Sequence, residues 1–473
     1  MLFYSSTSNF IKYVFFIQIL YCSILMANET NFRANPEVGL ENNIKISIAN
    51  SKNSMVVCAD KRAALAAKKI LQKGGNAIDA AIAAQNVLSV VEPQSSGIGG
   101  GGFLIYYNSK LNSLEAWDGR EFAPSSSKTN QFIDLQNKKI PFLKAVVSPS
   151  SIGVPGLYSM LADVHIVHGK TEWKNLFKDA VLYAESFKVS PRLNKMLKWA
   201  PHIKNDIYAR KIYFDDRKPK NIGAIVKNIE LLKSLKALSK NSYSVNRGEI
   251  SKLIDKKLSP VITKKDLSSW KTIQRKTICK KYKGYDICGF PPPTSGGIGV
   301  LQILGILENI EINFNPLNTF LDEHLFLEAA RLAYADRNIY IADPDFFAVP
   351  LKDLLSNKYL KKRSTLIKIK KASKEIKHGN FQGFKGSSLG IGKNFDFPST
   401  THISIIDNDG NAVALTSSIE FAFGSGKTVG GFFLNNQLTD FSFASHNKNG
   451  DLIANSVAAK KKTKVKYGSY FSF

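Results

Sequence analysis

The sequence predicts a mixed α/β (or α+β) fold, because strand patterns and helix patterns both recur along it. Short apolar or alternating runs, typical of strands, occur at residues 54–60, 101–121 and 400–418. Longer Ala-, Leu- and Lys-rich stretches with helical spacing separate them. The chain has 473 residues, 44% of them hydrophobic and 22% charged, which is enough to bury a large core in roughly three domains or one interwoven domain.

The first half of the chain begins with a strand and two helices. Residues 54–60 (SMVVCAD) indicate a buried strand, and residues 61–74 indicate a helix that ends at a glycine. Residues 76–93 are almost entirely apolar, so we expect a buried helix. Residues 101–121 predict two strands around a polar turn, and residues 155–260 are mostly helical with Lys-rich faces.

The second half alternates rigid loops, helices and one hairpin. Residues 290–310 predict a proline-rich loop that leads into a long apolar helix, and residues 324–346 predict another helix that ends near Asp343. Residues 378–399 are rich in Gly and Ser without periodicity, which is typical of a flexible linker. A hairpin starting at Thr400 follows directly.

The N-terminus predicts an export signal over residues 1–27. Lys12 precedes an apolar stretch at residues 13–27 that ends in the small residue Ala27. The stretch is shorter than a usual membrane-spanning helix, and no other segment approaches that length. We therefore expect a periplasmic or secreted protein that contacts the membrane only through this segment. Leu25 matches the small-residue cleavage pattern imperfectly, so an uncleaved anchor is the alternative.

The chain carries 65 Lys and Arg against 38 Asp and Glu, a net charge of +27. The lysines are scattered, apart from runs at residues 360–377 and 460–466. They are not interleaved with stacking aromatic residues, and no nucleic-acid-binding motif is present. We interpret the excess as a compositional bias rather than a functional basic patch, and expect no nucleic-acid partner.

Several cofactor and metal motifs are excluded by their context. The GIGGGG run at residues 97–102 fits a dinucleotide fingerprint, but a helix precedes it and a strand follows, the reverse of what such a site needs. The GSGKT run at residues 424–428 lacks the first glycine of a phosphate loop. The histidines have no zinc-ligand spacing, and we expect His165 and His168 to lie on a solvated helix face. We therefore expect no cofactor and no metal.

Two cysteines, Cys279 and Cys288, flank a predicted hairpin that turns at Lys283-Gly284. In an oxidising compartment they can form a cross-strand disulfide. Two unpaired core cysteines are the alternative, which the Cα separation decides.

Thr400 begins a predicted strand and directly follows the predicted linker. This arrangement suits a threonine that acts as a nucleophile after the chain is cut just before it. A threonine hydroxyl is weak without a base, and its own α-amino group supplies one if the preceding peptide bond is cut. The reference pKa of such an amine, about 7.7–8.0, suits proton transfer near neutrality. The pattern alone is not specific, because linkers lead into strands in many proteins.

Blocks along residues 54–455 resemble, in order, the gamma-glutamyltransferase (glutathione hydrolase) family of N-terminal nucleophile hydrolases. The blocks read VVEPQSSGIGGGGFLIYY, DGREFAP, IGVPG, PPPTSGG, AYADRNIYIADPDF, TTHISIIDNDGNAVALTSSIEFAFGSG and GGFFLNNQLTDFS. The resemblance implies a four-layer αββα sandwich. It also implies a large-subunit region at residues 28–399 and a small-subunit region at residues 400–473, produced by self-cleavage between Ser399 and Thr400.

The resemblance also implies the roles of six residues. Thr400 matches the catalytic nucleophile, and Ser418 takes the place of a threonine that hydrogen-bonds it. Arg120 matches the arginine that binds the substrate α-carboxylate, for which its planar fork is suited. Residues matching the groups around the substrate α-amino group are Glu420, Gln437 and Asp440.

The implied activity is γ-glutamyl transfer from glutathione or related compounds to water or to an amino acid or peptide, without a cofactor. The partners are these substrates and the chain's own two fragments. An acylase for another side chain and a non-catalytic remnant are the alternatives. After residue 457 the sequence departs from the family, whose paired-serine and glycine-pair motifs have no counterpart there. The expectation is therefore a truncated chain that folds or turns over poorly.

Overall fold

The computed structural model describes residues 49–310, 319–381, 389–391 and 399–454. The signal segment at residues 1–27, the divergent tail at 458–473 and much of the linker at 378–399 lie outside the described residues. The expectations that rest on those segments stay predictions. None of the described helices has both the length and the apolar character needed to cross a membrane.

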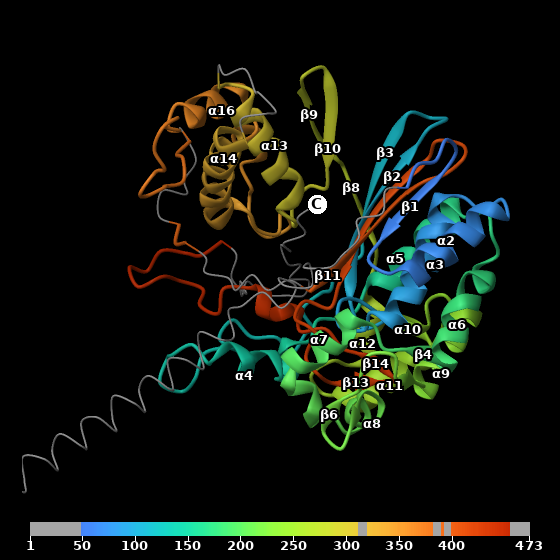
Figure 1. The fold of residues 1–473 in the computed structure, drawn as a ribbon. Helices are drawn as coiled ribbons and strands as arrows, with labels where there is room; N and C mark the ends of the chain where they lie inside the picture. The colour runs from blue at the N-terminus through green and yellow to red at the C-terminus, as the bar shows by residue number, and fades with distance from the viewer. Residues whose placement is uncertain (1–48, 311–318, 382–388, 392–398, 455–473) are drawn as a thin grey trace, which may run out of the picture. The chain divides into compact units, whose positions relative to one another are not determined.

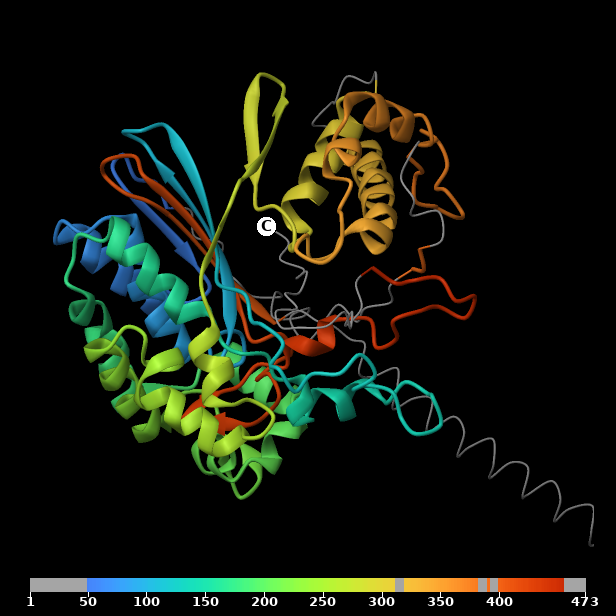
Figure 2. The same cartoon turned by 180° about the vertical axis from the view of Figure 1, so that it is seen from behind.

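A six-stranded antiparallel sheet organises the described fold (Figures 1 and 2). Strands β11 and β12, from the end of the described chain, pair with each other in the middle of the sheet, between N-terminal strands. The turn between them contains Gly410, whose φ of 81° suits a residue without a Cβ. In sheet order the strands are β1 (Met55–Cys58), β11 (Thr400–Ile406), β12 (Ala412–Ser418), β2 (Gly101–Asn108), β3 (Ser113–Asp118) and β8 (Ile273–Arg275).

One face of the sheet is covered by helices, among them α2 (Lys61–Gln72), α3 (Ala77–Val91) and α5 (Leu157–His168) (Figure 1). All 15 residues of α3 are buried, as its apolar sequence predicted. Asn76 and Asp79 cap this helix reciprocally, each side chain accepting a hydrogen bond from the other's backbone N–H. The cap satisfies donors that would otherwise be buried without partners.

The remaining described elements are further helices and short strand pairs. The helices are α4 (Phe142–Val146), α6 (Lys178–Glu185), α7 (Pro191–Trp199), α8 (Ile207–Tyr213), α9 (Ile229–Lys240), α10 (Ser244–Arg247), α11 (Glu249–Leu258), α12 (Lys264–Ser269), α13 (Gly296–Leu307), α14 (Thr319–Tyr340), α15 (Leu351–Leu354) and α16 (Asn357–Ser364). Short two-stranded pairs are β4 (Phe187–Lys188) with β7 (Ile225–Val226), β5 (Phe214–Asp215) with β6 (Lys218–Pro219), and β13 (Thr428–Val429) with β14 (Phe432–Phe433). The predominantly helical character predicted for residues 155–260 is confirmed.

The second face of the sheet is partly apolar and carries a groove of about 420 Å³. Val57 and Ile406 lie along this groove with 60% and 51% of their surface exposed, whereas Ile403 and Ile405 on the helix-covered face are buried. A sandwich would cover such a face with a second sheet. The described residues thus supply one sheet with helices on one of its faces, as part of the expected four-layer arrangement.

A second hydrophobic core lies among α13, α14 and α16. The helix predicted at residues 324–346 is α14, which begins earlier, at Thr319, and ends at Tyr340. A buried ion pair between Arg363 and Asp336 (3.2 Å) links α16 to α14. The hydroxyl of Tyr359 also donates to Asp336, so the buried carboxylate has several partners.

Strands β9 (Ile278–Tyr282) and β10 (Tyr285–Gly289) form the predicted cysteine hairpin. Lys283 and Gly284 have φ values of 47° and 86°, as a tight two-residue hairpin turn requires. Cys279 and Cys288 lie directly opposite each other, with Cα atoms 4.1 Å apart, and form a disulfide. The alternative of two unpaired cysteines does not apply to this structure.

His165 and His168 do not lie on a solvated face, so that expectation was wrong. The Nε2 atom of His165 lies 2.8 Å from the carbonyl oxygen of Thr171, and that of His168 lies 2.9 Å from the carboxylate of Glu115. The helix face that carries them packs against β3, whose Trp117 ring contacts His168. Within the described residues no group of His, Cys, Asp and Glu side chains could hold a metal ion.

Candidate active site around Thr400

Thr400 is the first residue of β11 and lies directly opposite Ser418, the last residue of β12. Residues opposite each other in antiparallel strands project to the same face, so the two hydroxyl groups meet. The Thr400 Oγ1 donates a hydrogen bond to the Ser418 Oγ over 3.1 Å. The contact expected between the Thr400 and Ser418 hydroxyl groups is therefore present.

The Ser418 hydroxyl makes three hydrogen bonds around the expected cleavage point. It donates its proton to the carbonyl oxygen of Ser399, 3.1 Å away, and accepts the backbone N–H of Glu420 over 2.9 Å. Because its single proton is committed to Ser399, Ser418 acts as the acceptor toward Thr400. A continuous chain of hydrogen bonds thus runs from the Thr400 hydroxyl to the carbonyl oxygen of the bond before it.

The glycine run at residues 97–102 packs tightly beside this hydroxyl pair. A Cβ atom on Gly100 would lie 2.2 Å from the backbone oxygen of Ser418, closer than real contacts allow. A Cβ on Gly101, the sheet partner of Ser418, would lie 2.2 Å from a carboxylate oxygen of Glu121. The glycines therefore allow close backbone approach rather than nucleotide binding.

Arg120 follows β3 and is completely buried. Its Nη2 donates to the Asp440 carboxylate over 2.8 Å, forming an ion pair between residues 320 positions apart. The backbone of Arg120 is held as well: its N–H donates to Asp118 (3.0 Å) and its carbonyl accepts the Trp270 indole N–H (3.0 Å). The guanidinium is thus a fixed internal group and not a surface turn residue.

Glu420, Gln437 and Asp440 gather around the short 3₁₀ helix η5 (Gln437–Asp440). The side-chain amide of Gln437 donates to the Asp440 carboxylate, and that of Asn436 donates to the Glu420 carboxylate. Glu420 has a φ of +75°, a conformation that non-glycine residues adopt rarely and often at functional sites. The structure thus brings all the residues expected to bind substrate into one network with Arg120.

Burial raises the pKa of two carboxyl groups in this network. The pKa of Glu420 lies well above its ordinary value, because the group is buried and because Asp440 places a second negative charge nearby. Burial also raises the pKa of Glu121 to about 7, although the neighbouring Arg120 charge opposes the shift. Glu121, Glu420 and Asp440 therefore lie around the single guanidinium of Arg120. Such a polar cluster suits a ligand that carries its own charges.

The sequence reasoning missed three residues of this network. Glu121 lies 3.6 Å from the Arg120 Nε, and Asn436 fixes Glu420. Asn435 donates to the backbone carbonyls of Gly99 (2.7 Å) and Gly153 (2.9 Å), so it joins three segments of the site. Their only sequence signal is that each lies inside a block that carries the family resemblance.

Comparison with known proteins supports the family resemblance. The family model for gamma-glutamyltranspeptidase matches residues 63–466. The chain belongs to the gamma-glutamyltranspeptidase family. It is 34% identical over 403 residues to the glutathione hydrolase proenzyme of Bacillus subtilis (strain 168), covering 82% of this chain and 68% of that protein. The Escherichia coli (strain K12) glutathione hydrolase proenzyme is 33% identical, with 83% and 67% covered.

Solved structures of gamma-glutamyltranspeptidase relatives confirm the α/β fold class. The Helicobacter pylori gamma-glutamyltranspeptidase matches with a TM-score of 0.67 and 31% identity, over 72% of this chain and all of that chain. A cephalosporin acylase from Bacillus halodurans matches with a TM-score of 0.73, over 91% of this chain and 76% of that one. Its identity is 24%, so that likeness concerns the fold alone.

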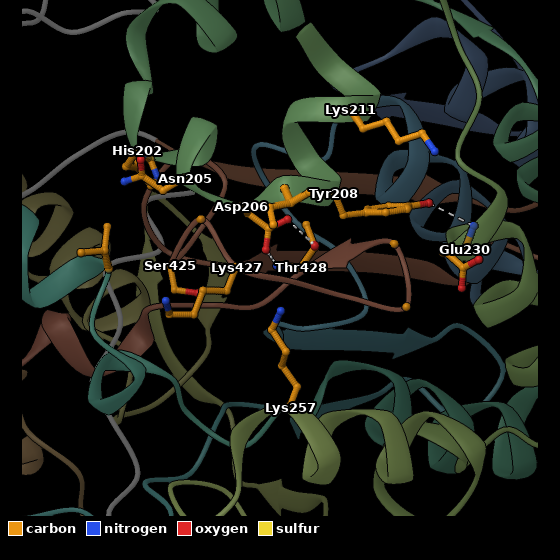
Figure 3. A pocket seen from close by; sticks show the side chains of 15 residues that line it. His202, Asn205, Asp206, Tyr208, Lys211, Glu230, Lys257, Ser425, Lys427 and Thr428 are labelled. Atoms are coloured by element: carbon orange, nitrogen blue, oxygen red, sulfur yellow. Dashed lines mark hydrogen bonds between the residues drawn. The ribbon is translucent and has the colours of Figure 1, made fainter. Parts of the chain in front are cut away.

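A cavity of about 650 Å³ lies apart from the Thr400 site, beside α8 and the GSGKT run (Figure 3). Asp206 lines this cavity, and its carboxylate accepts hydrogen bonds from the N–H of Thr428 (3.1 Å) and from the Thr428 hydroxyl (2.7 Å). The N–H groups of Ser425 and Gly426 donate to backbone carbonyls. The loop therefore uses these amides internally and does not cradle a phosphate. None of the predicted site residues lines this cavity.

Proposed function

We propose that this chain is a γ-glutamyltransferase (glutathione hydrolase) that cleaves itself before Thr400 and then uses Thr400 as its nucleophile. The observation that carries the proposal is the hydrogen-bond chain from Thr400 through Ser418 to the Ser399 carbonyl oxygen. Membership of the gamma-glutamyltranspeptidase family and the "proenzyme" names of its relatives support it.

Self-cleavage begins when the Thr400 Oγ1 attacks the carbonyl carbon of Ser399. The proton of Thr400 passes to the Ser418 oxygen as the Ser418 proton passes to the carbonyl oxygen, which gives a neutral tetrahedral intermediate. The C–N bond then breaks as the new hydroxyl gives its proton to the nitrogen of Thr400, and the re-formed carbonyl belongs to an ester that joins Ser399 to the Thr400 oxygen. Water hydrolyses this ester, leaving a carboxylate on Ser399 and both a hydroxyl and an α-amine on Thr400.

The released amine is the base for turnover. The Thr400 hydroxyl attacks the γ-carbonyl carbon of the substrate and gives its proton to the α-amine, whose reference pKa is about 7.7–8.0. The amine leaving group departs with that proton, and a γ-glutamyl ester remains on Thr400. Water releases glutamate from the ester, whereas the amine of an amino acid or peptide acceptor forms a new γ-glutamyl amide.

The ion pair between Arg120 and Asp440 supports a γ-glutamyl substrate over other acyl groups. A γ-glutamyl group carries an α-carboxylate and an α-ammonium, which match the guanidinium and the carboxylate respectively. Substrate binding would exchange the internal pair for two pairs with the ligand. An acylase substrate without an α-amino acid group offers no charged partner to either Arg120 or Asp440, so this exchange could not take place. The ion pair therefore disfavours the acylase alternative.

The test uses the purified chain and a γ-glutamyl anilide. We expect mass spectrometry to find fragments divided between Ser399 and Thr400, and release of the aniline from the substrate to depend on that cleavage. Thr400→Ala should abolish both cleavage and turnover. A chain that stays intact and shows no turnover would favour the non-catalytic remnant, and turnover of acyl anilides without an α-amino group would favour the acylase.

We also propose that the protein works outside the cytoplasm. The apolar segment at residues 13–27 supports export. The disulfide between Cys279 and Cys288 supports it independently, because such bonds persist in oxidising compartments. Fractionation of the source cells tests this: the protein should appear in the periplasmic or secreted fraction, and its N-terminal sequence should show whether residues 1–27 are removed.

A further inference from the structure

Ser399 contributes more to the cleavage point than its carbonyl group. The residue is 2% exposed, and its hydroxyl donates to the backbone carbonyl of Gln94 over 2.6 Å. Its carbonyl oxygen accepts the Ser418 hydroxyl over 3.1 Å. The residue before the cleaved bond is therefore held at two points, one on its side chain and one on the reacting group.

The segment that receives this hydroxyl is itself fixed to the segment that directly follows β12. The Gln94 carbonyl also accepts the N–H of Phe423 over 3.0 Å, and the Ser95 carbonyl accepts that of Ile419 over 3.3 Å. The Gln94 side-chain amide donates to the Glu92 carboxylate over 2.6 Å. Ser399 is thus anchored to a rigid part of the site, whose position relative to Ser418 is set by these backbone hydrogen bonds.

This anchor restricts rotation of the Ser399–Thr400 peptide group. An acyl shift requires the attacking oxygen to lie within about 3–3.5 Å of the carbonyl carbon along a suitable direction, and small misplacements slow such reactions strongly. Without the Ser399 hydroxyl, the carbonyl group of Ser399 would be oriented by its hydrogen bond from Ser418 alone. The Ser399 hydroxyl does not touch the reacting atoms, so it can act only through orientation.

We propose that the Ser399 hydroxyl, by donating to the Gln94 carbonyl, is a positioning group for self-cleavage with no part in turnover afterwards. The inference rests on the proposed self-cleavage and adds a residue to it. Once the bond is cut, the Ser399 carbonyl becomes a carboxylate at the end of the large fragment and no longer reacts. The hydroxyl should therefore affect the rate of maturation but not the kinetics of the mature enzyme.

A mainly structural role is distinguishable from a positioning role. In Ser399→Ala the Gln94 carbonyl keeps its hydrogen bond from Phe423, so no buried acceptor is left without a partner. We therefore expect little change in the thermal midpoint. Ser425 provides a matched control: it is 1% exposed and donates its hydroxyl over 3.0 Å to the Leu434 carbonyl, which likewise accepts a backbone N–H.

The experiment follows cleavage of the freshly purified full chain by gel electrophoresis and mass spectrometry. We expect Ser399→Ala to cleave about 10-fold more slowly than the unaltered chain, the size of effect that loss of one hydrogen bond produces. Ser399→Thr should cleave faster than Ser399→Ala, because it restores the hydroxyl, and Ser425→Ala should cleave at the original rate. After cleavage is complete, kcat and KM for a γ-glutamyl anilide should equal those of the unaltered enzyme.

Equal cleavage rates for Ser399→Ala and the unaltered chain would overturn the inference while leaving the proposed function intact. Loss of the cooperative thermal transition in Ser399→Ala, or an equal slowing in Ser425→Ala, would also overturn it, since either result would show a structural role. Failure of the proposed function looks different: the unaltered chain itself would not cleave.

Discussion

Ser418 donates a hydrogen bond to the carbonyl oxygen of Ser399 while it accepts one from the Thr400 hydroxyl. One side chain therefore contacts both the attacking oxygen and the oxygen that gains electron density. A hydroxyl suits this position because it donates one proton and accepts others. Serine therefore offers the same group as the threonine that the family resemblance implies at this position.

We predict that Ser418→Ala slows self-cleavage about 10²–10³-fold, the usual effect of removing one donor to a developing oxyanion. Ser418→Thr should retain most of the rate, because the hydroxyl remains. Time courses of fragment formation, recorded with circular dichroism spectra to verify folding, measure both effects. If Ser418→Ala matured as fast as the original chain, the proton path through Ser418 would have to be abandoned.

The Arg120–Asp440 pair leads to a prediction about substrate affinity. Arg120→Lys keeps the positive charge but loses the planar fork that binds a carboxylate through two parallel hydrogen bonds. Since a hydrogen bond to a charged group contributes about 1.5–3 kcal/mol, we expect kcat/KM to fall about 10- to 100-fold, mainly through KM. Steady-state kinetics with a γ-glutamyl anilide measure this change.

Arg363→Lys is the matched control for that change. Arg363 is also buried and paired with a carboxylate, that of Asp336, but it belongs to the second core among α13, α14 and α16. Its replacement should lower the thermal midpoint and leave KM unchanged. A similar rise of KM in both variants would mean that the effect of Arg120→Lys reflects general loosening and not substrate binding.

The hairpin that carries Thr400 was predictable from local pattern. Alternation placed Ile403 and Ile405 on one face and Ser404 on the other, and the Asp-Asn-Asp-Gly turn set the register that brings Thr400 opposite Ser418. Because strand side chains have a period of two, these constraints leave few other pairings.

The contacts between distant segments were not predictable from local pattern. Arg120 and Asp440 are separated by 320 positions, and nothing in the sequence around either one indicates the other. Only the family resemblance placed them in one site. The misjudged histidines show a related limit. The chain just past the helix brings the Thr171 carbonyl to His165, and the partner of His168, Glu115, depends on how the helix packs against β3. Tertiary packing decides such contacts, and helical periodicity does not report it.

Glu121 makes the stability of the chain depend on pH. Its pKa in the folded state is about 7, against about 4.3 for an unperturbed glutamate, because burial disfavours the charged form. Between these values the folded state holds more protons than the unfolded state, so the free energy of unfolding falls as pH rises. The stabilisation is complete below about pH 4.3 and is lost as pH rises through about 7, a loss of about 4 kcal/mol for this group.

Glu121→Gln should weaken this dependence, because an amide does not titrate. Denaturant titrations of both proteins at several pH values between 4.5 and 7.5 give the comparison. Some dependence should remain, since the pKa of Glu420 is raised as well. Parallel curves for the two proteins would show that the Glu121 carboxyl does not change its protonation in this range.

The disulfide between Cys279 and Cys288 should stabilise the β9–β10 hairpin without affecting catalysis. Closing a loop of this length restricts the unfolded chain by about 2–3 kcal/mol in the loop-entropy model. Ile278 and Ile287 of the hairpin pack into the second core, so we expect the effect to appear as easier unfolding of that core.

Replacement of both cysteines by serine should therefore lower the thermal midpoint under oxidising conditions and leave kcat and KM unchanged. Adding a reductant should bring the original protein to the midpoint of the double variant. A midpoint insensitive to both changes would mean that the hairpin opens separately from the core that it contacts.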